Sequence, residues 1–286
     1  MKQTCPCCGS NSVKHFVTVS NYDYYDCSGC HSLFIDPTYL SKIDNGFNIV
    51  KYEEGYWQME LESAWQRAYG PALARMAEAV YYCKRQINKI LDIGTGPGYF
   101  LDAIEKLLPD NAHMFYGVEL FPPSEEFRSK SKNYIIGDLG DLTDKYDCGI
   151  CVEVVEHLTP TMIHDILSKL ARVSNPDALY IFNTGMPDYV KHEDRGYLDP
   201  TKRGHLVSYS LKAMSLIGGK YGFTAHRIPG KTWAFALEFT TDKKAAQNDI
   251  RDRIWHASEH NLNILCDKNM GSVLRVLGLD TARAYN

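Results

Sequence analysis

The sequence predicts an α/β fold, in which a doubly wound, seven-stranded and mostly parallel sheet follows a small cysteine-rich unit. Three observations predict it. Apolar runs of strand length alternate with helical patterns from residue 89 onward, a glycine-rich turn follows the first of these strands, and five cysteines fall within the first thirty residues. Repeated strand–helix units of this length are typical of a parallel sheet covered by helices.

The chain divides into four parts on these patterns. Residues 1–37 are rich in cysteine and poor in aliphatic side chains, so a unit this small needs a staple to fold. Residues 38–88 are predicted to form a helical cap or linker. Within it, Gly70-Pro71 predicts a break before a second helix at about 71–86.

Residues 89–242 carry the alternating pattern, and residues 243–286 are predicted to form a C-terminal helical extension. Thr159-Pro160 has the pattern of a helix start, with Thr159 as N-cap and Pro160 in the first position. The last two strands are expected to form an antiparallel hairpin. The predicted strands are 90–93, 115–120, 134–136, 147–152, 178–183, 222–228 and 232–239, and further helices are expected at 99–108 and 209–218.

Composition favours an ordinary cytoplasmic protein. No apolar run approaches the length of a membrane-spanning helix, and the first residues lack the apolar core of a signal peptide. The net charge of −4 argues against a long nucleic-acid partner, because a protein that grips many phosphates usually carries a basic excess. The oligomeric state is not predicted.

The segment Asp92–Gly98 joins the first strand to a helix through a Gly-x-Gly-x-Gly turn. Glycines allow a close approach of ligand and backbone, and the N–H groups at the helix start can face a polar group. Alone, such a turn is compatible with NAD, FAD or S-adenosylmethionine, or with a purely structural role. Its spacing differs from the Gly-x-Gly-x-x-Gly dinucleotide fingerprint. Asp92 would repel a pyrophosphate but suits a cationic group, and Glu119 ends the second strand, where it can accept both ribose hydroxyls.

These residues resemble class I S-adenosylmethionine-dependent methyltransferases, which have a Rossmann-like fold. Asp92–Gly98 is similar to their first motif, Glu119 to their ribose-binding acid, and Gly137-Asp138-Leu139 to the motif whose Asp meets the adenine amino group. The stretch Tyr146–Leu158 resembles the fourth-strand motif, which passes beside the methionine part of the cofactor. The resemblance covers about residues 89–240 and implies these cofactor-binding residues: Asp92, Gly94, Thr95, Gly96, Gly98, Tyr99, Glu119, Leu120, Asp138, Leu139 and Glu153.

The cysteines near the N-terminus form two Cys-x-x-Cys knuckles, Cys5/Cys8 and Cys27/Cys30, separated by 18 residues. Four thiolates at this spacing predict a tetrahedral zinc site with a structural role. A redox pair is the alternative, and nothing in the sequence favours it. Cys7 is a spare thiol, and His15 and His31 are weaker alternative ligands.

The knuckles followed by Leu33–Pro37 resemble the zinc ribbon of one branch of these methyltransferases, many of which act on sugars or small polar metabolites. The segment Tyr52–Trp57 resembles the aromatic helix that such proteins fold over the cofactor, which implies that Tyr52 and Tyr56 contact it. The sequence departs from the commonest form of the ribbon at His31, where glycine usually follows the fourth cysteine.

Methyl transfer requires an aligned acceptor and often a base. His157 and His205 lie on loops expected at the carboxyl edge of the parallel strands, where ligands bind in open α/β sheets. Each is a candidate base, and each has an alternative role in packing or in orienting a hydrogen bond. The charged run 192–195 lies in the 185–204 loop, which is either a substrate lid or simply solvated.

Three functions remain open on the sequence. The favoured one is methyl transfer, preferably to oxygen, on a small polar acceptor such as a sugar. An RNA methyltransferase whose ribbon holds RNA is the second, although residues 1–37 carry only two basic side chains, Lys2 and Lys14. A non-catalytic protein that binds S-adenosylmethionine as a sensor or scaffold is the third.

Overall fold

The computed structural model describes residues 3–47, 54–240 and 250–273, with the side chains of 54–59 left aside. Its centre is a seven-stranded sheet in the order β10-β11-β8-β7-β4-β5-β6. All neighbours are parallel except β10–β11 and β11–β8. The predicted fold class and its antiparallel hairpin are therefore confirmed. The strands are β4 (Ile90–Ile93), β5 (Phe115–Glu119), β6 (Tyr134–Ile136), β7 (Tyr146–Val152), β8 (Ser174–Asn183), β10 (Phe223–Arg227) and β11 (Ala234–Phe239).

The strand order reverses at β4, which has β5 on one side and β7 on the other. The connections that leave β4 and β7 therefore diverge to opposite faces, and a crevice opens at the carboxyl ends of these strands. In open α/β sheets, ligands bind in this crevice. The segments after β4, β5, β7 and β8 are the ones that the topology places around it.

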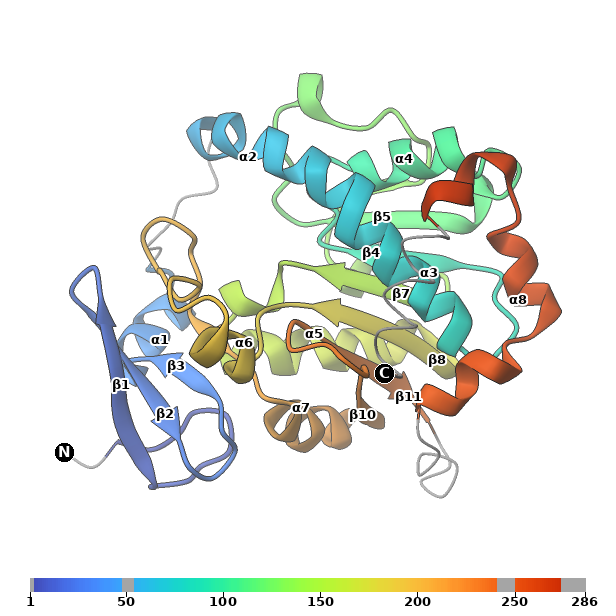
Figure 1. Cartoon of the computed structure of the whole chain (residues 1–286). Coiled ribbons are helices and arrows are strands. Elements are labelled where there is room, and N and C mark those ends of the chain that lie inside the picture. The colour runs from blue at the N-terminus through green and yellow to red at the C-terminus, as the bar shows by residue number, and fades with distance from the viewer. Residues whose placement is uncertain (1–2, 48–53, 241–249, 274–286) are drawn as a thin grey trace.

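Two helical layers cover the sheet (Figure 1). Side chains alternate between the faces, as the two-residue period of a strand requires. On β8, Leu179 and Ile181 pack toward α3, α4 and α8, whereas Tyr180 and Phe182 pack toward α5 and α7. The helices of the first layer are α3 (Leu73–Tyr82), α4 (Tyr99–Leu107) and α8 (Glu259–Ile264), and those of the second are α5 (Pro160–Val173) and α7 (Leu211–Gly218).

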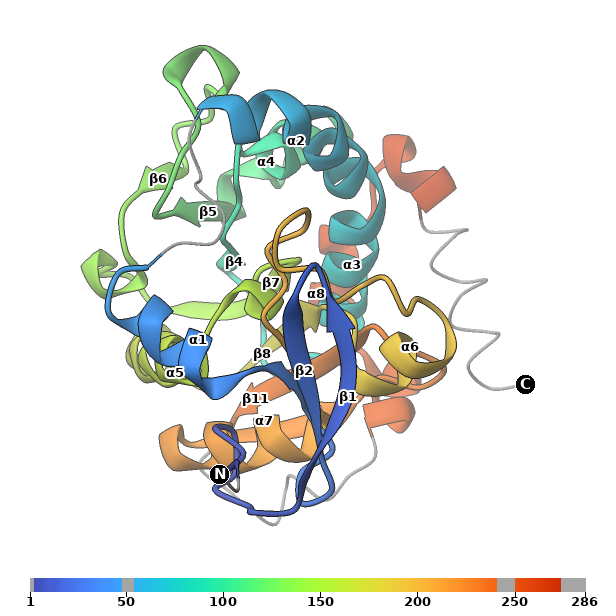
Figure 2. The ribbon, with the colours of Figure 1, turned by 90° about the vertical axis from the view of Figure 1, so that its left-hand side faces the viewer.

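The N-terminal unit is a small antiparallel sheet in the order β1-β2-β3-β9. Its strands β1 (Val13–Val19), β2 (Tyr22–Cys27) and β3 (Leu33–Ile35) come from the ribbon, but β9 (Val207–Ser208) comes from the loop that follows β8. Figure 2 shows this sheet in front of the carboxyl end of the larger one. Its buried side chains join the same apolar core as α5 and α7.

Along the chain, α1 (Pro37–Asp44) and α2 (Glu54–Arg67) follow the strands of the ribbon, and α2 packs against α4. The predicted break at Gly70-Pro71 is wrong: residues Ala68–Ala72 form a π-helical turn that joins α2 to α3. The wider turn accommodates a proline that has no N–H to donate and would crowd the carbonyl of a regular helix. The predicted start of α5 is confirmed, because the Thr159 side chain accepts a hydrogen bond from the N–H of Met162.

Residues 250–273 pack beside α3 as a 3₁₀ segment, Ile250–His256, followed by α8 and a 3₁₀ turn, Lys268–Met270. Within the described residues of the C-terminal part, which was predicted to be helical, α8 is the α-helix. A further short helix, α6 (Pro187–His192), lies in the loop after β8. None of the helices in the described part of the chain is long and apolar enough to cross a membrane.

Candidate functional site

The glycine-rich turn after β4 adopts backbone conformations that favour glycine. Gly94, Gly96 and Gly98 have φ angles of +70°, +59° and +82°. A Cβ atom on Gly94 would lie 2.7 Å from a methyl group of Val154. The turn therefore packs directly against the segment that follows β7, which brings the ends of β4 and β7 together. Thr95, inside the turn, is buried, and its N–H donates to the carbonyl of Val118.

Two acids stand at the ends of adjacent strands beside this turn. Glu119, at the end of β5, accepts hydrogen bonds from the N–H groups of Gly96 and Phe121, each at 2.8 Å. Burial raises its pKa, and these N–H groups oppose that rise. Asp92 on β4 is also buried, and its burial, with the charge of Glu119, raises its pKa to about 7. Two buried carboxylates thus share a small volume, where a cation or hydroxyl donors would stabilise them.

Asp138 follows β6 and marks the third strand end. One carboxylate oxygen accepts the N–H of Gly140 at 2.6 Å, and the other accepts the Lys169 ammonium at 2.9 Å. Partial burial raises the pKa of Asp138, but Lys169 and the Gly140 N–H outweigh it, so the pKa lies below its usual range. The carboxylate is therefore ionised and fixed in place. Leu139, next to it, is buried.

An apolar surface lies between Glu119 and Asp138. Leu120 and Phe121 follow β5, Ile136 ends β6, and each is more than half exposed. Exposed apolar side chains that gather at one strand edge are typical of a binding surface. Tyr99, at the start of α4, is half-buried. The acids and this surface together form a strip along the ends of β4, β5 and β6, which we call the strand-end strip (Asp92, Glu119, Leu120, Ile136 and Asp138).

A second group lies after β7 and β8. Glu153 has a left-handed φ of +54°, which is uncommon for a residue with a side chain. Its carboxylate accepts the Asn183 amide at 2.9 Å. Glu156 is fully buried, and its Oε1 accepts the hydroxyl of Tyr197 at 2.8 Å. Burial and the mutual proximity of the two glutamates raise the pKa of Glu153, and burial raises that of Glu156.

Two histidines complete this group, which we call the acid–histidine cluster (Glu153, Glu156, His157 and His205). Their rings lie 4.9 Å apart, edge to face. The Nδ1 atom of His157 hydrogen-bonds the carbonyl of Gly204 at 3.2 Å, and that of His205 the carbonyl of Tyr197 at 2.7 Å. Nδ1 is the donor in both, so Nε2 carries the lone pair. Burial lowers the pKa of His157 to about 4 and that of His205 to about 2.

Residues of the ribbon hold the backbone around His205. The hydroxyl of Tyr24, on β2, donates to the His205 carbonyl at 2.6 Å. The following strand, β9, pairs with β3, and Ser210 donates its hydroxyl to the Cys30 carbonyl at 2.5 Å. The position of His205 is therefore set by residues of the N-terminal unit as well as by its own loop.

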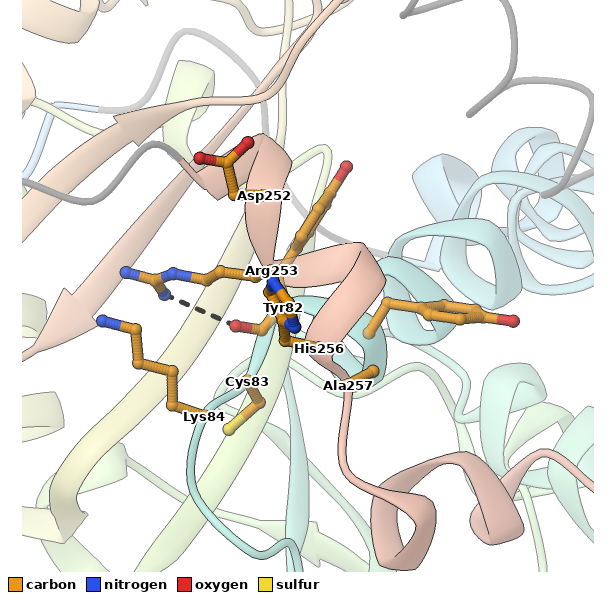
Figure 3. A pocket seen from close by; sticks show the side chains of 8 residues that line it. Tyr82, Cys83, Lys84, Asp252, Arg253, His256 and Ala257 are labelled. Carbon is orange, nitrogen blue, oxygen red and sulfur yellow. Dashed lines mark hydrogen bonds between the residues drawn. The ribbon is translucent and has the colours of Figure 1, made fainter.

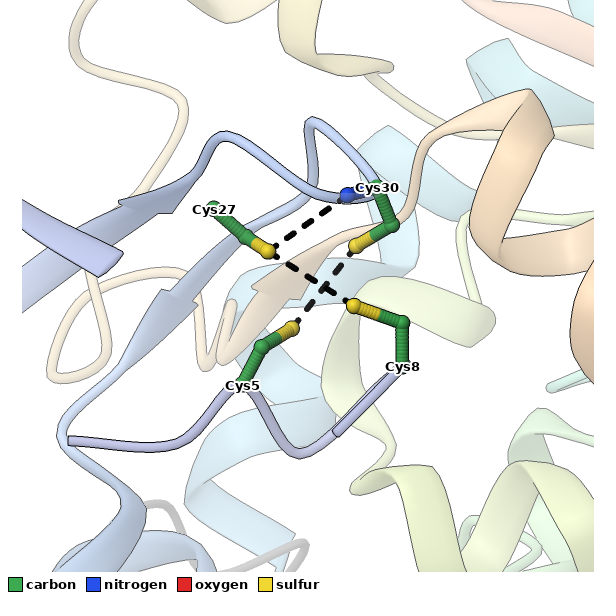
Figure 4. A group of neighbouring side chains, drawn as sticks. All are labelled: Cys5, Cys8, Cys27 and Cys30. Atoms are coloured by element: carbon green, nitrogen blue, oxygen red, sulfur yellow. Dashed lines mark hydrogen bonds between the residues drawn. The ribbon is translucent and has the colours of Figure 1, made fainter. Parts of the chain in front are cut away.

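The structure brings the four knuckle cysteines together (Figure 4). The Sγ atoms of Cys5 and Cys30 lie 3.7 Å apart, and those of Cys8 and Cys27 lie 3.6 Å apart. A tetrahedral zinc with Zn–S bonds of about 2.3 Å requires S–S distances of about 3.8 Å. The spacing of this cysteine cluster therefore fits zinc.

The other side chains near the ribbon are not part of the tetrahedron. Cys7 is buried next to the four but does not belong to their group. His15 hydrogen-bonds Thr18 and Asp23 on the hairpin. His31 has a φ of +69°, the conformation that explains why glycine is usual at this position.

A cavity of about 370 Å³ lies elsewhere, between the end of α3 and the Ile250–His256 segment (Figure 3). Because α3 ends just before β4 begins, the cavity lies toward the amino edge of the sheet, away from the glycine turn. Its arginine, Arg253, is held by two hydrogen bonds to Glu238, at 2.8 and 2.9 Å, and contacts the Tyr82 carbonyl at 3.4 Å. The charge of Arg253 is therefore already paired, and Lys84, Asp252 and His256 also line the cavity.

The structure thus gathers the residues predicted to bind the cofactor or act as bases into two neighbouring places and the four cysteines into a third, except for two residues. Tyr52 lies outside the described residues, and Tyr56 lies on α2 with its side chain outside them. Sequence reasoning missed Glu156, Tyr197 and Asn183. Glu156 had a signal, because it directly precedes His157, whereas Tyr197 and Asn183 join the cluster only through the fold of the loop after β8.

Residues 61–228 match the family model described as a methyltransferase domain. A comparison with curated proteins gives no match. Among solved structures, an amino pentose methyltransferase from Micromonospora echinaspora is 14% identical, with a TM-score of 0.47 over 63% of this chain and 96% of that one. A SAM-dependent methyltransferase from Archaeoglobus fulgidus is 18% identical, with a TM-score of 0.44 over 64% and 98%. An assigned O-methyltransferase from Nostoc punctiforme is 17% identical, with a TM-score of 0.46 over 61% of this chain. This chain spans 59% of the length of that protein.

Proposed function

The chain belongs to the methyltransferase domain family, and we propose that it transfers the methyl group of S-adenosylmethionine to a hydroxyl of a small polar acceptor, such as a sugar. The observation that carries this proposal is the strand-end strip. Asp92, Glu119 and Asp138 stand at the ends of three adjacent strands, on the crevice side of the glycine turn. That is where open α/β sheets bind nucleotide-like ligands.

The strip fits the parts of this cofactor in order. Glu119 is oriented by two N–H groups toward the turn, as an acceptor for ribose hydroxyls. Leu120 and Ile136 offer an apolar surface for adenine, and Asp138 is a fixed, ionised acceptor for its amino group. Asp92, whose pKa is raised to about 7, would be stabilised by the cationic methionine end. We assign Gly94, Gly96, Gly98, Thr95, Tyr99, Leu139, Glu153, Tyr52 and Tyr56 to the same pocket.

When bound, the cofactor supplies a methyl group on a positively charged sulfur. The turn packs on Val154, so that sulfur would lie near Glu153 and the acid–histidine cluster. His157 and His205 each direct Nδ1 to a backbone carbonyl, so in each neutral ring Nε2 is the nitrogen that carries the lone pair. We assign these two residues to acceptor activation. Alignment of the hydroxyl with the methyl group is the main requirement of an in-line displacement.

A small acceptor is favoured by the enclosure of this cluster. Glu156 is fully buried and His205 is 6% exposed, so a hydroxyl must enter a closed space to reach them. A short polar molecule can do so more readily than an RNA duplex. Tyr197 and Asn183 add hydrogen-bonding groups to the walls. Specific recognition of a polyhydroxylated molecule relies on such groups.

The cysteine cluster is assigned a structural zinc, held by Cys5, Cys8, Cys27 and Cys30. Four thiolates saturate a tetrahedral ion, so this ion has no open position for an acceptor. On this basis we assign residues 1–37 to the ribbon, 38–88 to a helical cap, 89–242 to the methyltransferase domain and 243–286 to a C-terminal extension.

The proposal is tested by incubating the zinc-loaded protein with S-adenosylmethionine and, separately, with sugar nucleotides, free sugars and short RNAs. Mass spectrometry should find S-adenosylhomocysteine together with a sugar or sugar nucleotide that has gained one methyl group. Methylated RNA instead would replace the acceptor class. Tight cofactor binding with no turnover on any acceptor would favour a sensor or scaffold. His157→Gln and His205→Gln should both lower turnover and leave cofactor binding unchanged, and equal turnover in the parent and both variants would remove them from the mechanism.

A further inference from the structure

The acid–histidine cluster contains a second group of metal-ligating side chains. Glu156, His157 and His205 each offer a ligand atom, and these three atoms lie within 4.8 Å of one another. The Nε2 atom of His205 is 3.9 Å from the Oε1 atom of Glu156. Ligands around one cation lie about 3–4.5 Å apart when the metal–ligand distance is about 2.1 Å. Small side-chain movements would therefore place all three on a single ion.

The histidines are held in the tautomer that metal ligation requires. Gly204 and Tyr197 supply backbone carbonyls that take the Nδ1–H of the two rings. A histidine that binds a metal almost always donates its other ring N–H to such a partner, which orients the ring and raises the basicity of the ligating nitrogen. Both rings have this arrangement within one small cluster.

Glu156 provides an independent observation. It is fully buried, and Tyr197 donates only to its Oε1 atom. The other oxygen, Oε2, has no hydrogen-bond partner within the described chain. A buried carboxylate oxygen without a donor is costly, and most are satisfied by a protein group, a water or an ion. The carboxylate that carries this unpartnered oxygen belongs to the same group as the two histidines, and its Oε1 atom is the one that lies 3.9 Å from Nε2 of His205.

The charged groups that act on the cluster are of both signs. Glu153 interacts with Glu156, and burial raises the pKa of both. Arg67 acts on Glu153 and His157. Arg203 acts on His205 but is paired with Asp194, and Arg75 is committed to Glu78 and Asn183. The fully buried Glu156 and the half-buried Glu153 beside two neutral histidines are the composition of a cation site.

We propose that Glu156, His157 and His205 bind one divalent transition-metal cation. Two imidazoles and a carboxylate favour Mn²⁺, Fe²⁺, Co²⁺ or Zn²⁺ over Ca²⁺ and Mg²⁺, which prefer oxygen ligands. Three protein ligands leave coordination positions open, unlike the four thiolates of the ribbon.

The consequence for catalysis rests on the proposed methyl transfer. An acceptor hydroxyl at an open position would lose its proton more readily, because the cation stabilises the alkoxide. Its O–H bond breaks and the proton passes to solvent water. The oxygen then forms the bond to the methyl carbon as the C–S bond breaks, and that electron pair stays on sulfur. In this arrangement the histidines orient the cation instead of accepting the proton.

The test uses the zinc-loaded protein without S-adenosylmethionine, and Mn²⁺ as the probe. Thiolates bind Mn²⁺ poorly, so the ribbon should not compete. The decrease in the electron paramagnetic resonance signal of free Mn²⁺ should correspond to one bound ion per chain. Glu156→Gln and His205→Gln should each weaken that binding about 100-fold or more, because each removes a direct ligand. The matched control His113→Gln, an exposed histidine between α4 and β5, should bind as the parent does.

Thermal unfolding without Mn²⁺ verifies that each variant is folded, and His157→Gln replaces any that is not. Absence of bound Mn²⁺ in the parent, with no competing Zn²⁺ or Co²⁺ at the cluster by elemental analysis, would overturn the site. Equal Mn²⁺ affinity in the parent and the folded variants would overturn it too. Because the readout needs neither cofactor nor acceptor, it is independent of the methyl-transfer proposal: bound Mn²⁺ without any methylated product would contradict only that proposal.

Discussion

The ribbon and the carboxyl edge of the large sheet both gather metal-ligating side chains, but they do so by different means. The cysteine cluster takes its ligands from two short knuckles, and each knuckle keeps its two cysteines three residues apart. The acid–histidine cluster takes Glu156 and His157 from the 3₁₀ turn that follows β7 and His205 from the far end of the loop after β8. Local spacing encodes the first group, and strand order with loop packing creates the second.

The two regions also differ in what holds them. The ribbon is small, shares its buried side chains with the core around α5 and α7, and would gain a staple from the proposed zinc. The edge of the sheet is supported by seven strands and two helical layers. They meet where β9 pairs with β3 and where Tyr24 contacts the His205 carbonyl. We therefore expect damage to the ribbon to reach the acid–histidine cluster, and damage to the strand-end strip to leave the ribbon intact.

The largest expected effect comes from removing one zinc ligand. Cys27→Ser should reduce bound zinc from about one per chain to less than about one-tenth, because structural zinc supplies much of the folding free energy of such units. Elemental analysis measures the zinc, and near-ultraviolet circular dichroism should report loss of packing around the ribbon tyrosines. Cys7→Ser is the matched control in the same unit and should keep its zinc. A Cys27→Ser protein that retains a full zinc complement would break the contrast between the two clusters.

The second effect is a pH dependence confined to the sheet edge. The pKa of Asp92 is about 7 in the free site, and a cationic ligand favours its ionised form. Affinity for S-adenosylmethionine should therefore be constant well above pH 7 and fall as the pH drops through 7. At pH 6 it should be about tenfold weaker than at pH 8, since one pKa unit corresponds to a factor of ten.

Isothermal titration calorimetry between pH 8 and pH 6 measures this change, with zinc content followed in parallel. Asp92→Asn should bind more weakly at pH 8 and lose most of the pH dependence. An unchanged slope in that variant would assign the titration to another group, and a flat profile in the parent would remove the role given to Asp92.

The smallest effect tests the junction between the regions. Tyr24→Phe removes the hydroxyl that donates to the His205 carbonyl, and it should lower the free energy of unfolding by about 1–2 kcal/mol. Urea denaturation measures that loss. Tyr25→Phe is the control on the same strand, because the half-buried Tyr25 makes no side-chain hydrogen bond among the described residues. Equal losses in the two variants would mean that the ribbon does not hold His205 through this contact.

The sequence predicted the sheet, its hairpin and the start of α5 because their signals are periodic or local. Thr159 and Pro160, for instance, lie next to each other at a helix start. It failed at Gly70-Pro71, where the π-helical turn keeps the chain helical through a proline. Tertiary packing decided that outcome, and single-residue preferences do not record it.

The candidate site, like the fold, was predicted only in part. Glu119 and Asp138 could be found because motifs at strand ends follow the strand order. Tyr197 and Asn183 could not, because each reaches the acid–histidine cluster only after the loop and β8 are in place. The role of the ribbon in holding His205 was hidden for the same reason, since β9 is a two-residue strand with no periodic signal.

The central claim is that the strand-end strip binds S-adenosylmethionine, and titration calorimetry of the zinc-loaded protein with this compound tests it most directly. We predict one molecule bound per chain and a loss of about 2–3 kcal/mol of binding free energy in Glu119→Ala, because a charged hydrogen-bonding partner is removed. Glu125→Ala, an exposed acid a few residues further along, should bind as the parent does. No binding by the parent protein, or equal affinity in Glu119→Ala, would contradict the claim.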